Sequence, residues 1–218
     1  MLLRVDWFWS FRSPYCYLAT GRIVALAANY DLAVSVRPVL PLAIRAPEFF
    51  RNINPLQRYY HRLDAERVAS IYEIDFAWPD PDPVMVDPKT QEVSAEQPHI
   101  HRLTFLGIEA VRRDRGLAFV HEVSRIIWSG RVKGWDRGEH LARATGRAGL
   151  DLDEMDAAIA ADPASYQKEA EANHAALRAA GHWGVPTMVF EGEPFFGQDR
   201  IDACVWRMQH HGLSLRSS

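Results

Sequence analysis

Cysteine is scarce in this chain: its 218 residues contain only Cys16 and Cys204. Two cysteines do not form a disulfide framework of the kind that holds small secreted domains together. Cys204 shares a helical stripe with Ile201, Val205 and Met208, so we expect it to be a buried apolar side chain. The length and a hydrophobic content of 48% allow one large domain or a domain with an inserted subdomain.

The sequence also lacks long apolar runs, a strong net charge and metal-ligand spacings. No apolar run is long enough to span a bilayer, and the first ten residues show no signal-peptide cleavage site. A net charge of −3 and a pI near 6.3 give no reason to expect nucleic acid or an anionic membrane as partner. The nine histidines have no partners at metal-binding spacings, so we expect no metal. These absences favour a soluble protein of a reducing compartment, the cytoplasm.

Residues 5–17, VDWFWSFRSPYCY, are the stretch around which the chain is organised. Up to Ser10 the residues alternate with a period of two, which predicts a strand with one strongly apolar face. Ser13 and Pro14 then have the residue types of an N-cap and a first helical position. An apolar stripe at spacings of three and four predicts a helix beyond them: Cys16, Ala19, Ile23, Leu26 and Tyr30.

A strand that runs directly into a helix leaves the first amide groups of that helix unpaired. The positive end of the helix dipole then faces outward, and such a place can hold an anion. A thiolate is such an anion, because the pKa of a thiol falls at a helix N-terminus.

The rest of the chain divides into a strand, a long helical region and a second pair of strands. Residues 32–39 predict a second strand, and the connection completes a βαβ unit. Helices follow from Asp64, after Pro98, around residues 119–127, over 136–147 and 153–161, and from Tyr166 to Gly181. A proline-rich loop over residues 76–98 is long enough to be a lid or a wall. Residues 188–190 and 194–196 predict two strands, and Asp199 caps a final helix to about residue 210.

The tetrapeptide Ser13-Pro14-Tyr15-Cys16 resembles the thioredoxin-like superfamily, whose redox members carry Cys-x-x-Cys at this turn. Ser13 takes the place of the first cysteine, and Cys16 keeps the second. The Ser-Pro-Tyr version is similar to 2-hydroxychromene-2-carboxylate isomerases and the related kappa-class glutathione transferases. In that family the protein supplies a hydroxyl and glutathione supplies the sulfur, so the resemblance implies that Ser13 is catalytic. The alternative is that Ser13 is only a helix cap.

The resemblance implies an α/β fold of the thioredoxin-like type, βαβ followed by ββα, interrupted by a large helical insertion. Residues 1–44 and 181–218 would form the discontinuous thioredoxin-like domain, and residues 45–180 the helical insertion domain. The family also suggests a homodimer.

Two further motifs resemble parts of the family's glutathione site. Val185 precedes Pro186 in a dipeptide that we predict to be cis, so that its backbone can pair with an extended peptide such as glutathione. A trans proline at the start of an edge strand is the alternative. Gln198, Asp199 and Arg200 match a motif that holds the γ-glutamyl end, with Asp199 as carboxylate partner of the α-amino group. Asp199 as a helix cap alone is the other interpretation.

Three other positions resemble those at which the isomerases contact their aromatic carboxylate substrate. These are Arg45 as the cation, Asn54 in the early insertion, and Asn173 late in the insertion. Asn173 facing solvent is the alternative for that position. Ser10 and Arg12 depart from the family pattern, where Asp and an apolar residue are usual, and these differences bear on the substrate more than on the mechanism.

The sequence therefore predicts a glutathione-dependent isomerase of an aromatic unsaturated keto acid, typified by 2-hydroxychromene-2-carboxylate. Reversible addition of a thiolate to the conjugated double bond would allow rotation about it. A kappa-like glutathione transferase shares the first step and is the main alternative. A thiol-disulfide oxidoreductase using Cys16 and a peptide-binding module are the others. The oxidoreductase would need an exposed thiol of low pKa, and the peptide-binding module would not depend on glutathione.

Overall fold

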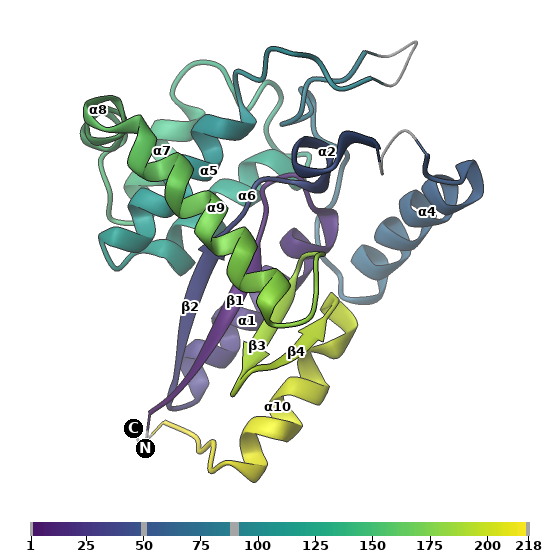
Figure 1. Cartoon of the computed structure of the whole chain (residues 1–218), viewed down its shortest axis with the longest axis vertical. Helices are drawn as coiled ribbons and strands as arrows, with labels where there is room; N and C mark the ends of the chain where they lie inside the picture. Colours follow the sequence, from purple (N-terminus) through teal and green to yellow (C-terminus); the bar gives the residue numbers. More distant parts are fainter. Residues whose placement is uncertain (1, 49–51, 88–91, 217–218) are drawn as a thin grey trace.

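The computed structural model describes residues 2–48, 52–87 and 92–216, and its centre is a four-stranded mixed sheet (Figure 1). The strands are β1 (Leu3–Trp9), β2 (Leu32–Pro38), β3 (Thr187–Phe190) and β4 (Glu193–Phe196). Their order in the sheet is β2-β1-β3-β4, with β1 parallel to β2 and antiparallel to β3. The predicted βαβ and ββα halves thus join into one sheet across the insertion.

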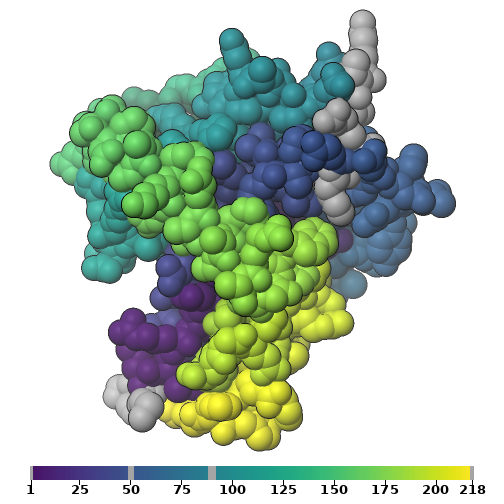
Figure 2. Space-filling model, in the orientation of Figure 1, coloured from purple at the N-terminus to yellow at the C-terminus, as the bar shows by residue number. Residues whose placement is uncertain are grey.

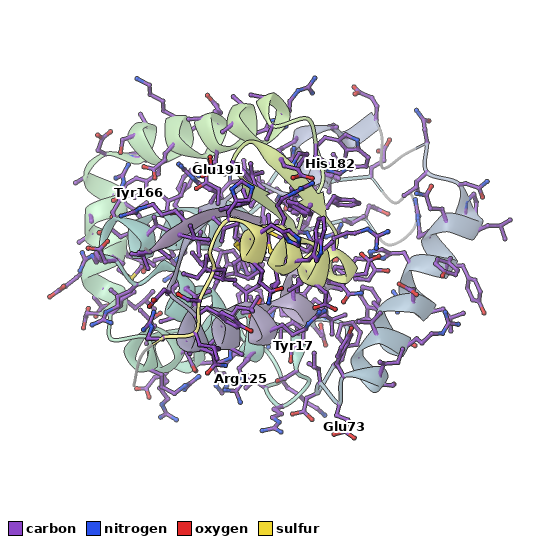
Figure 3. The ribbon with its side chains drawn as sticks, turned by 90° about the horizontal axis from the view of Figure 1, so that it is seen from below. Tyr17, Glu73, Arg125, Tyr166, His182 and Glu191 are labelled. Carbon is purple, nitrogen blue, oxygen red and sulfur yellow. The ribbon has the colours of Figure 1, made fainter. Side chains whose placement is uncertain are left out.

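The end of β1, from Trp7 to Trp9, is buried on both faces of the sheet, against different helices. Trp7 and Trp9 belong to the main core, which also receives α1 (Pro14–Asn29) and α10 (Ile201–His210). Phe8 points the other way and packs with Leu177 of α9 (Pro163–Ala179). Figure 3 shows the same arrangement, with α1 and α10 on one side of the sheet and α9 on the other. At this end of β1 the alternation therefore separates two buried layers, whereas Arg4 is exposed and Asp6 half-buried nearer the start of the strand.

The insertion consists of helices and one long loop. The helices before α9 are α2 (Leu42–Arg45), α4 (Pro55–Ile71), α5 (Ile100–Arg112), α6 (Gly116–Trp128), α7 (His140–Arg147) and α8 (Leu152–Ala161). Of the predicted loop over residues 76–98, the structure describes residues 76–87 and 92–98, which lie outside the helices and strands and form an isolated bridge between Val86 and Val93.

Three helix starts differ from the prediction by three residues or more. Helix α9 begins at Pro163 rather than at Tyr166, because the Asp162 side chain caps it. Helix α4 begins at Pro55, nine residues before the predicted Asp64, because the Asn54 side chain caps it by accepting a hydrogen bond from Leu56 N at 2.9 Å. Helix α7 begins at His140 rather than at residue 136, because a turn around Gly138, which has a φ of 57°, precedes it.

One hydrophobic core runs through the predicted domain and the predicted insertion. Trp9 and Ile23 share it with Phe119 and Trp128 of α6. Tyr17 of α1 and Arg125 of α6 lie on the same side of the molecule (Figure 3). In the space-filling view, the green residues of α9 cross the middle of this face, with the purple N-terminal residues and the yellow C-terminal segment below them (Figure 2). The boundaries at residues 44 and 181 therefore stay a prediction.

The final third matches the predicted order of strands and turns. Glu191 and Gly192, with φ of 49° and 80°, form the two-residue turn between β3 and β4, and Figure 3 labels Glu191 there. Glu193 belongs to β4 rather than to the turn. Among the described residues, no helix has both the length and the apolar composition needed to cross a membrane.

Candidate functional site

Ser13 occupies the N-cap of α1, as the sequence predicts. Its φ of −93° and ψ of 116° are extended, and its Oγ accepts a hydrogen bond from Cys16 N at 3.3 Å. Pro14 has no N–H, and the Tyr17 N–H donates to the Ser13 carbonyl at 3.2 Å. Within the part of the chain that the structure describes, the Tyr15 N–H donates to no protein acceptor. The start of α1 thus presents a half-buried hydroxyl and a helical amide.

Ser13 also meets the segment before β3, which is 172 residues away in the sequence. The Val185–Pro186 peptide bond is cis, and the Ser13 hydroxyl lies 3.4 Å from the Val185 carbonyl oxygen, to which it donates. The Gly197 N–H donates to the Pro186 carbonyl at 2.9 Å, and the Thr187 hydroxyl donates to the Gly184 carbonyl at 2.7 Å. The structure therefore brings together Ser13 and Val185, which the sequence analysis selected separately.

Cys16 lies under this turn and is fully buried. Burial raises the pKa of its thiol to about 12, against the opposing effect of hydrogen bonds with Ser13 and Ser10. The Cys204 thiol is buried elsewhere in the core, and burial raises its pKa to about 12 as well. Both cysteines are free thiols. A buried thiol of high pKa is a poor nucleophile, so the packing agrees with the interpretation of Cys16 as a core residue.

The residues 197–200 form a tight turn in front of α10, and here one prediction is wrong. Asp199 does not cap the final helix: it lies within a 3₁₀ turn (Gln198–Arg200), and α10 begins only at Ile201 with no side-chain cap. The reason is Gly197, whose φ of 108° turns the chain sharply into the 3₁₀ conformation. The Asp199 carboxylate instead accepts a hydrogen bond from Arg200 at 2.9 Å, and 59% of its side chain is exposed.

Gln198 is the buried member of this turn. Its backbone carbonyl accepts a hydrogen bond from Arg22 of α1 at 2.9 Å, and its side-chain oxygen lies 3.5 Å from the same guanidinium. Arg22 also pairs with Asp202 at 2.9 Å. The contacts of Gln198 thus fix the turn against α1 and leave Asp199 and Arg200 at the surface.

The three predicted substrate residues each make a structural contact. Arg45 donates to the Leu40 carbonyl at 2.5 Å and to the Trp183 carbonyl at 3.1 Å, and burial, with a smaller effect of Arg178, lowers its pKa to about 10. Asn173 is buried and donates to the Pro38 carbonyl at 3.0 Å, so it does not face solvent. Asn54 is the exposed cap of α4. Their contact with a substrate stays a prediction.

Aromatic side chains form a wall beside Val185. The His182 ring stacks on Phe196 with centroids 4.0 Å apart and on Trp183 at 5.4 Å. Trp183 and Phe196 are 47% and 43% exposed, which is unusual for such large apolar side chains. Figure 3 labels His182 at this end of the molecule. The wall is a flat aromatic surface next to the segment that meets Ser13.

A second group of side chains near Ser13 was missed by the sequence analysis. The Tyr15 hydroxyl donates to Asp64 of α4 at 2.7 Å, and the His61 ring meets the Tyr15 ring edge-on with centroids 5.1 Å apart. Burial raises the pKa of Tyr15, and the charges of Asp64 and, more weakly, Asp199 raise it further. Asn54-Pro55, which has the same form as Ser13-Pro14, could have revealed that α4 reaches this place.

The described residues offer no group of three or more His, Cys, Asp or Glu side chains placed to hold a metal ion. What they offer is a hydroxyl and an amide at a helix start, the carbonyl of Val185, and an exposed carboxylate beside a guanidinium. These hydrogen-bonding and charged groups suit a peptide-like ligand that carries both an anion and a zwitterionic end.

Comparisons with known proteins find a family model and relatives that match most of this chain. A family model described as the DSBA-like thioredoxin domain matches residues 4–209. A 2-hydroxychromene-2-carboxylate isomerase from Pseudomonas sp. (strain C18) is 26% identical over 207 residues, covering 92% of this chain and 88% of that protein.

Two solved structures share the fold. A 2-hydroxychromene-2-carboxylate isomerase superposes with a TM-score of 0.69 at 21% identity, covering 96% of each chain. The cytosolic disulfide reductase DsbM from Pseudomonas aeruginosa, solved with GSH, superposes with a TM-score of 0.59 at 15% identity, covering 96% of this chain and 100% of that one. At these identities the superpositions show the fold alone.

Proposed function

The chain belongs to the DSBA-like thioredoxin domain family, and on that premise we propose that it is a glutathione-dependent isomerase of an aromatic unsaturated keto acid of the 2-hydroxychromene-2-carboxylate type. The curated relative at 26% identity has the isomerase name, which supports this reaction class. The disulfide reductase of the same fold was solved with GSH, which supports a glutathione site in this architecture.

The observation that carries the proposal is the position of Ser13. Its hydroxyl stands at the helix start where redox relatives have a reactive cysteine, and it lies 3.4 Å from the Val185 carbonyl oxygen. The one cysteine nearby, Cys16, is buried and has a raised pKa. The protein thus presents a hydrogen-bond donor instead of a sulfur nucleophile, and this arrangement suits an external thiol.

The hydrogen-bonding and charged groups described above fit glutathione. The Ser13 hydroxyl and the Tyr15 N–H would hold its sulfur as the thiolate, and the backbone of Val185 would pair with its peptide part. Asp199 and Arg200 would hold the γ-glutamyl end, the carboxylate on its ammonium group and the guanidinium on its carboxylate. Gln198 would keep this turn in place through its contacts with Arg22.

Glutathione, when bound, supplies a thiolate that adds reversibly to the conjugated double bond and so permits rotation about it. Ser13 and the start of α1 stabilise the negative charge on sulfur, and each unit by which they lower the thiol pKa corresponds to about 1.4 kcal/mol. Arg45 and Asn173, with Asn54, would orient the substrate carboxylate. The aromatic wall of Trp183 and Phe196 offers a surface for the substrate ring.

Glutathione should raise the melting temperature of the protein. At a concentration one hundred times the Kd, binding adds about 2.7 kcal/mol to the free energy of unfolding. For a chain of this size that is a shift of roughly 5–10 °C. Thermal unfolding monitored with and without glutathione measures it, and a correctly folded protein that shows no shift at millimolar glutathione would contradict the proposed site.

Asp199→Ala and Asp202→Ala form a matched pair for the same experiment. Asp199→Ala should reduce the shift to less than half, because a charged hydrogen bond contributes about 1.5–3 kcal/mol. Asp202 is an exposed carboxylate on the same segment that pairs with Arg22, so Asp202→Ala should keep the full shift. Equal shifts in both variants would remove Asp199 from the glutathione site.

A further inference from the structure

His61 lies in the middle of α4, the helix at the edge of the molecule in Figure 1, and its ring contact with Tyr15 places it on the side of α4 that meets α1. Its ring meets Tyr15 edge-on, with centroids 5.1 Å apart and planes at 88°, and Trp78 at 6.2 Å. Tyr15 is two residues beyond Ser13, and its bond to Asp64 at 2.7 Å fixes α4 against this turn. The imidazole therefore packs on the side chain of Tyr15, at the helix start where the thiolate is proposed to bind.

The contacts of His61 use its ring carbons and faces. Among the described residues, neither ring nitrogen makes a hydrogen bond. The neighbouring polar groups are already paired. Asp64 accepts from Tyr15 and lies 3.6 Å from Arg67, and the Trp78 indole donates to Glu66 at 2.8 Å. Such a ring is positioned by packing while its nitrogens stay available for chemistry.

The charges around His61 favour the neutral imidazole. Burial lowers its pKa from the usual value, and the Arg12 guanidinium lowers it further. On its own helix Arg62, which stacks on Trp78 at 4.5 Å, acts in the same direction, and Asp64 opposes them. Arg12 itself is fixed by a bidentate pair with Asp82, with both bonds at 2.9 Å. The nearby phenol of Tyr15 has a raised pKa and is uncharged at neutral pH.

We propose that His61 is the acid–base group of the isomerisation, which accepts the proton of the bound thiol and delivers it to the carbonyl oxygen of the substrate. This inference rests on the proposed function. A neutral ring nitrogen takes the proton from sulfur and becomes imidazolium, which leaves the thiolate at Ser13. As the carbon–sulfur bond forms, the electron pair of the carbon–carbon double bond forms a new double bond to the carbonyl carbon. The carbonyl π pair then moves onto oxygen, and the imidazolium protonates that oxygen.

The same group serves the return step. His61 takes the proton back from oxygen, the carbonyl re-forms, and the carbon–sulfur bond breaks with its electron pair left on sulfur. No net proton, electron or atom is gained, so the cycle needs no co-reactant. A pKa below the usual value keeps the resting imidazole neutral at physiological pH, and it makes the imidazolium formed in the first step a stronger acid toward the developing oxygen charge.

The test compares His61→Gln and His61→Phe with the wild type. Phenylalanine keeps the aromatic packing on Tyr15 and Trp78, and glutamine keeps a polar side chain. The two variants preserve different properties of the histidine, so we expect at least one of them to fold. Both should bind glutathione within about threefold of the wild type and lose 10²- to 10⁴-fold in turnover, the usual effect of a general acid–base group. His101→Gln is the matched control, because His101 is also partly buried and also packs on an aromatic ring, Phe105, away from this turn.

Two readouts separate a proton role from a structural one. In the wild type, kcat/KM should fall as the pH drops through the His61 pKa, below about 6.5, and this limb should be absent in both variants. Ultraviolet titration should show that the pKa of the bound glutathione thiol is at least about one unit higher in the variants than in the wild type. The reason is that the variants have no imidazolium to stabilise the thiolate. A folded variant with wild-type turnover and wild-type titration overturns the inference.

The outcome for His61 is distinguishable from that for the proposed function. If the wild type binds glutathione but does not isomerise the keto acid, the proposed reaction fails, and the thiolate titration still decides whether His61 accepts the proton. If glutathione does not bind to the wild type, both proposals fail together.

Discussion

Replacing Ser13 by alanine should lower turnover roughly ten- to a hundredfold while it weakens glutathione binding less. At the start of α1 the Ser13 hydroxyl accepts a hydrogen bond from Cys16 N and donates one to the Val185 carbonyl. Loss of one hydrogen bond to a charged group costs about 1.5–3 kcal/mol. If this cost falls on the transition state, turnover drops roughly ten- to a hundredfold. The pKa of the bound thiol should rise, because the charged form loses its donor. Steady-state kinetics and ultraviolet titration of the thiolate measure the two effects.

Ser13→Thr is the control for the cap. Threonine keeps a hydroxyl, is an accepted N-cap residue and suits the extended backbone of position 13. It should retain most of the turnover, whereas Ser13→Ala also loses the cap and about 0.5–2 kcal/mol of stability. A Ser13→Ala protein that is only less stable, with unchanged turnover and titration, would mean that Ser13 is a helix cap and nothing more.

Replacing Trp128 by alanine should lower the free energy of unfolding by about 3–5 kcal/mol. The ring is almost fully buried at the end of α6, stacks on Phe76 with centroids 5.8 Å apart, and lies parallel to Tyr17 at 6.5 Å. Its indole N–H donates to the Phe11 carbonyl at 2.9 Å, so the substitution also leaves a buried acceptor without its partner. Urea unfolding measures the change.

Trp206→Ala provides the comparison, since Trp206 lies on α10 with 52% of its surface exposed. Its removal should change stability by no more than about 1 kcal/mol. Because α6 and the sheet share one core, Trp128→Ala should also leave a single unfolding transition. A loss of less than about 1 kcal/mol, or a separate transition for the insertion, would contradict this view of the core.

Local signals in the sequence predicted the sheet and the main turn well. Ser13-Pro14 combines a cap with a residue that fits only the first turn of a helix, and the structure has that helix from Pro14 to Asn29. The period of two in β1 predicted the strand, but it did not show that Phe8 is buried as well. Burial of the second face depends on α9, which is more than 150 residues away in the sequence.

The errors arose where a local signal has two meanings. Asp64 has the residue type of a helix start, but it lies inside α4, where its carboxylate binds Tyr15. Asp199 was predicted as a cap, but the left-handed Gly197 places it in a 3₁₀ turn. The neighbourhood of His61 could not be predicted, because it depends on how α4 packs against α1.

The most direct test of the account is the initial rate of isomerisation of 2-hydroxychromene-2-carboxylate at increasing glutathione concentration, with total glutathione measured before and after. We expect a rate that saturates with glutathione while the thiol is fully recovered, because the thiolate held at Ser13 adds and leaves again. A rate independent of glutathione, or one glutathione consumed for each substrate converted, would contradict the account.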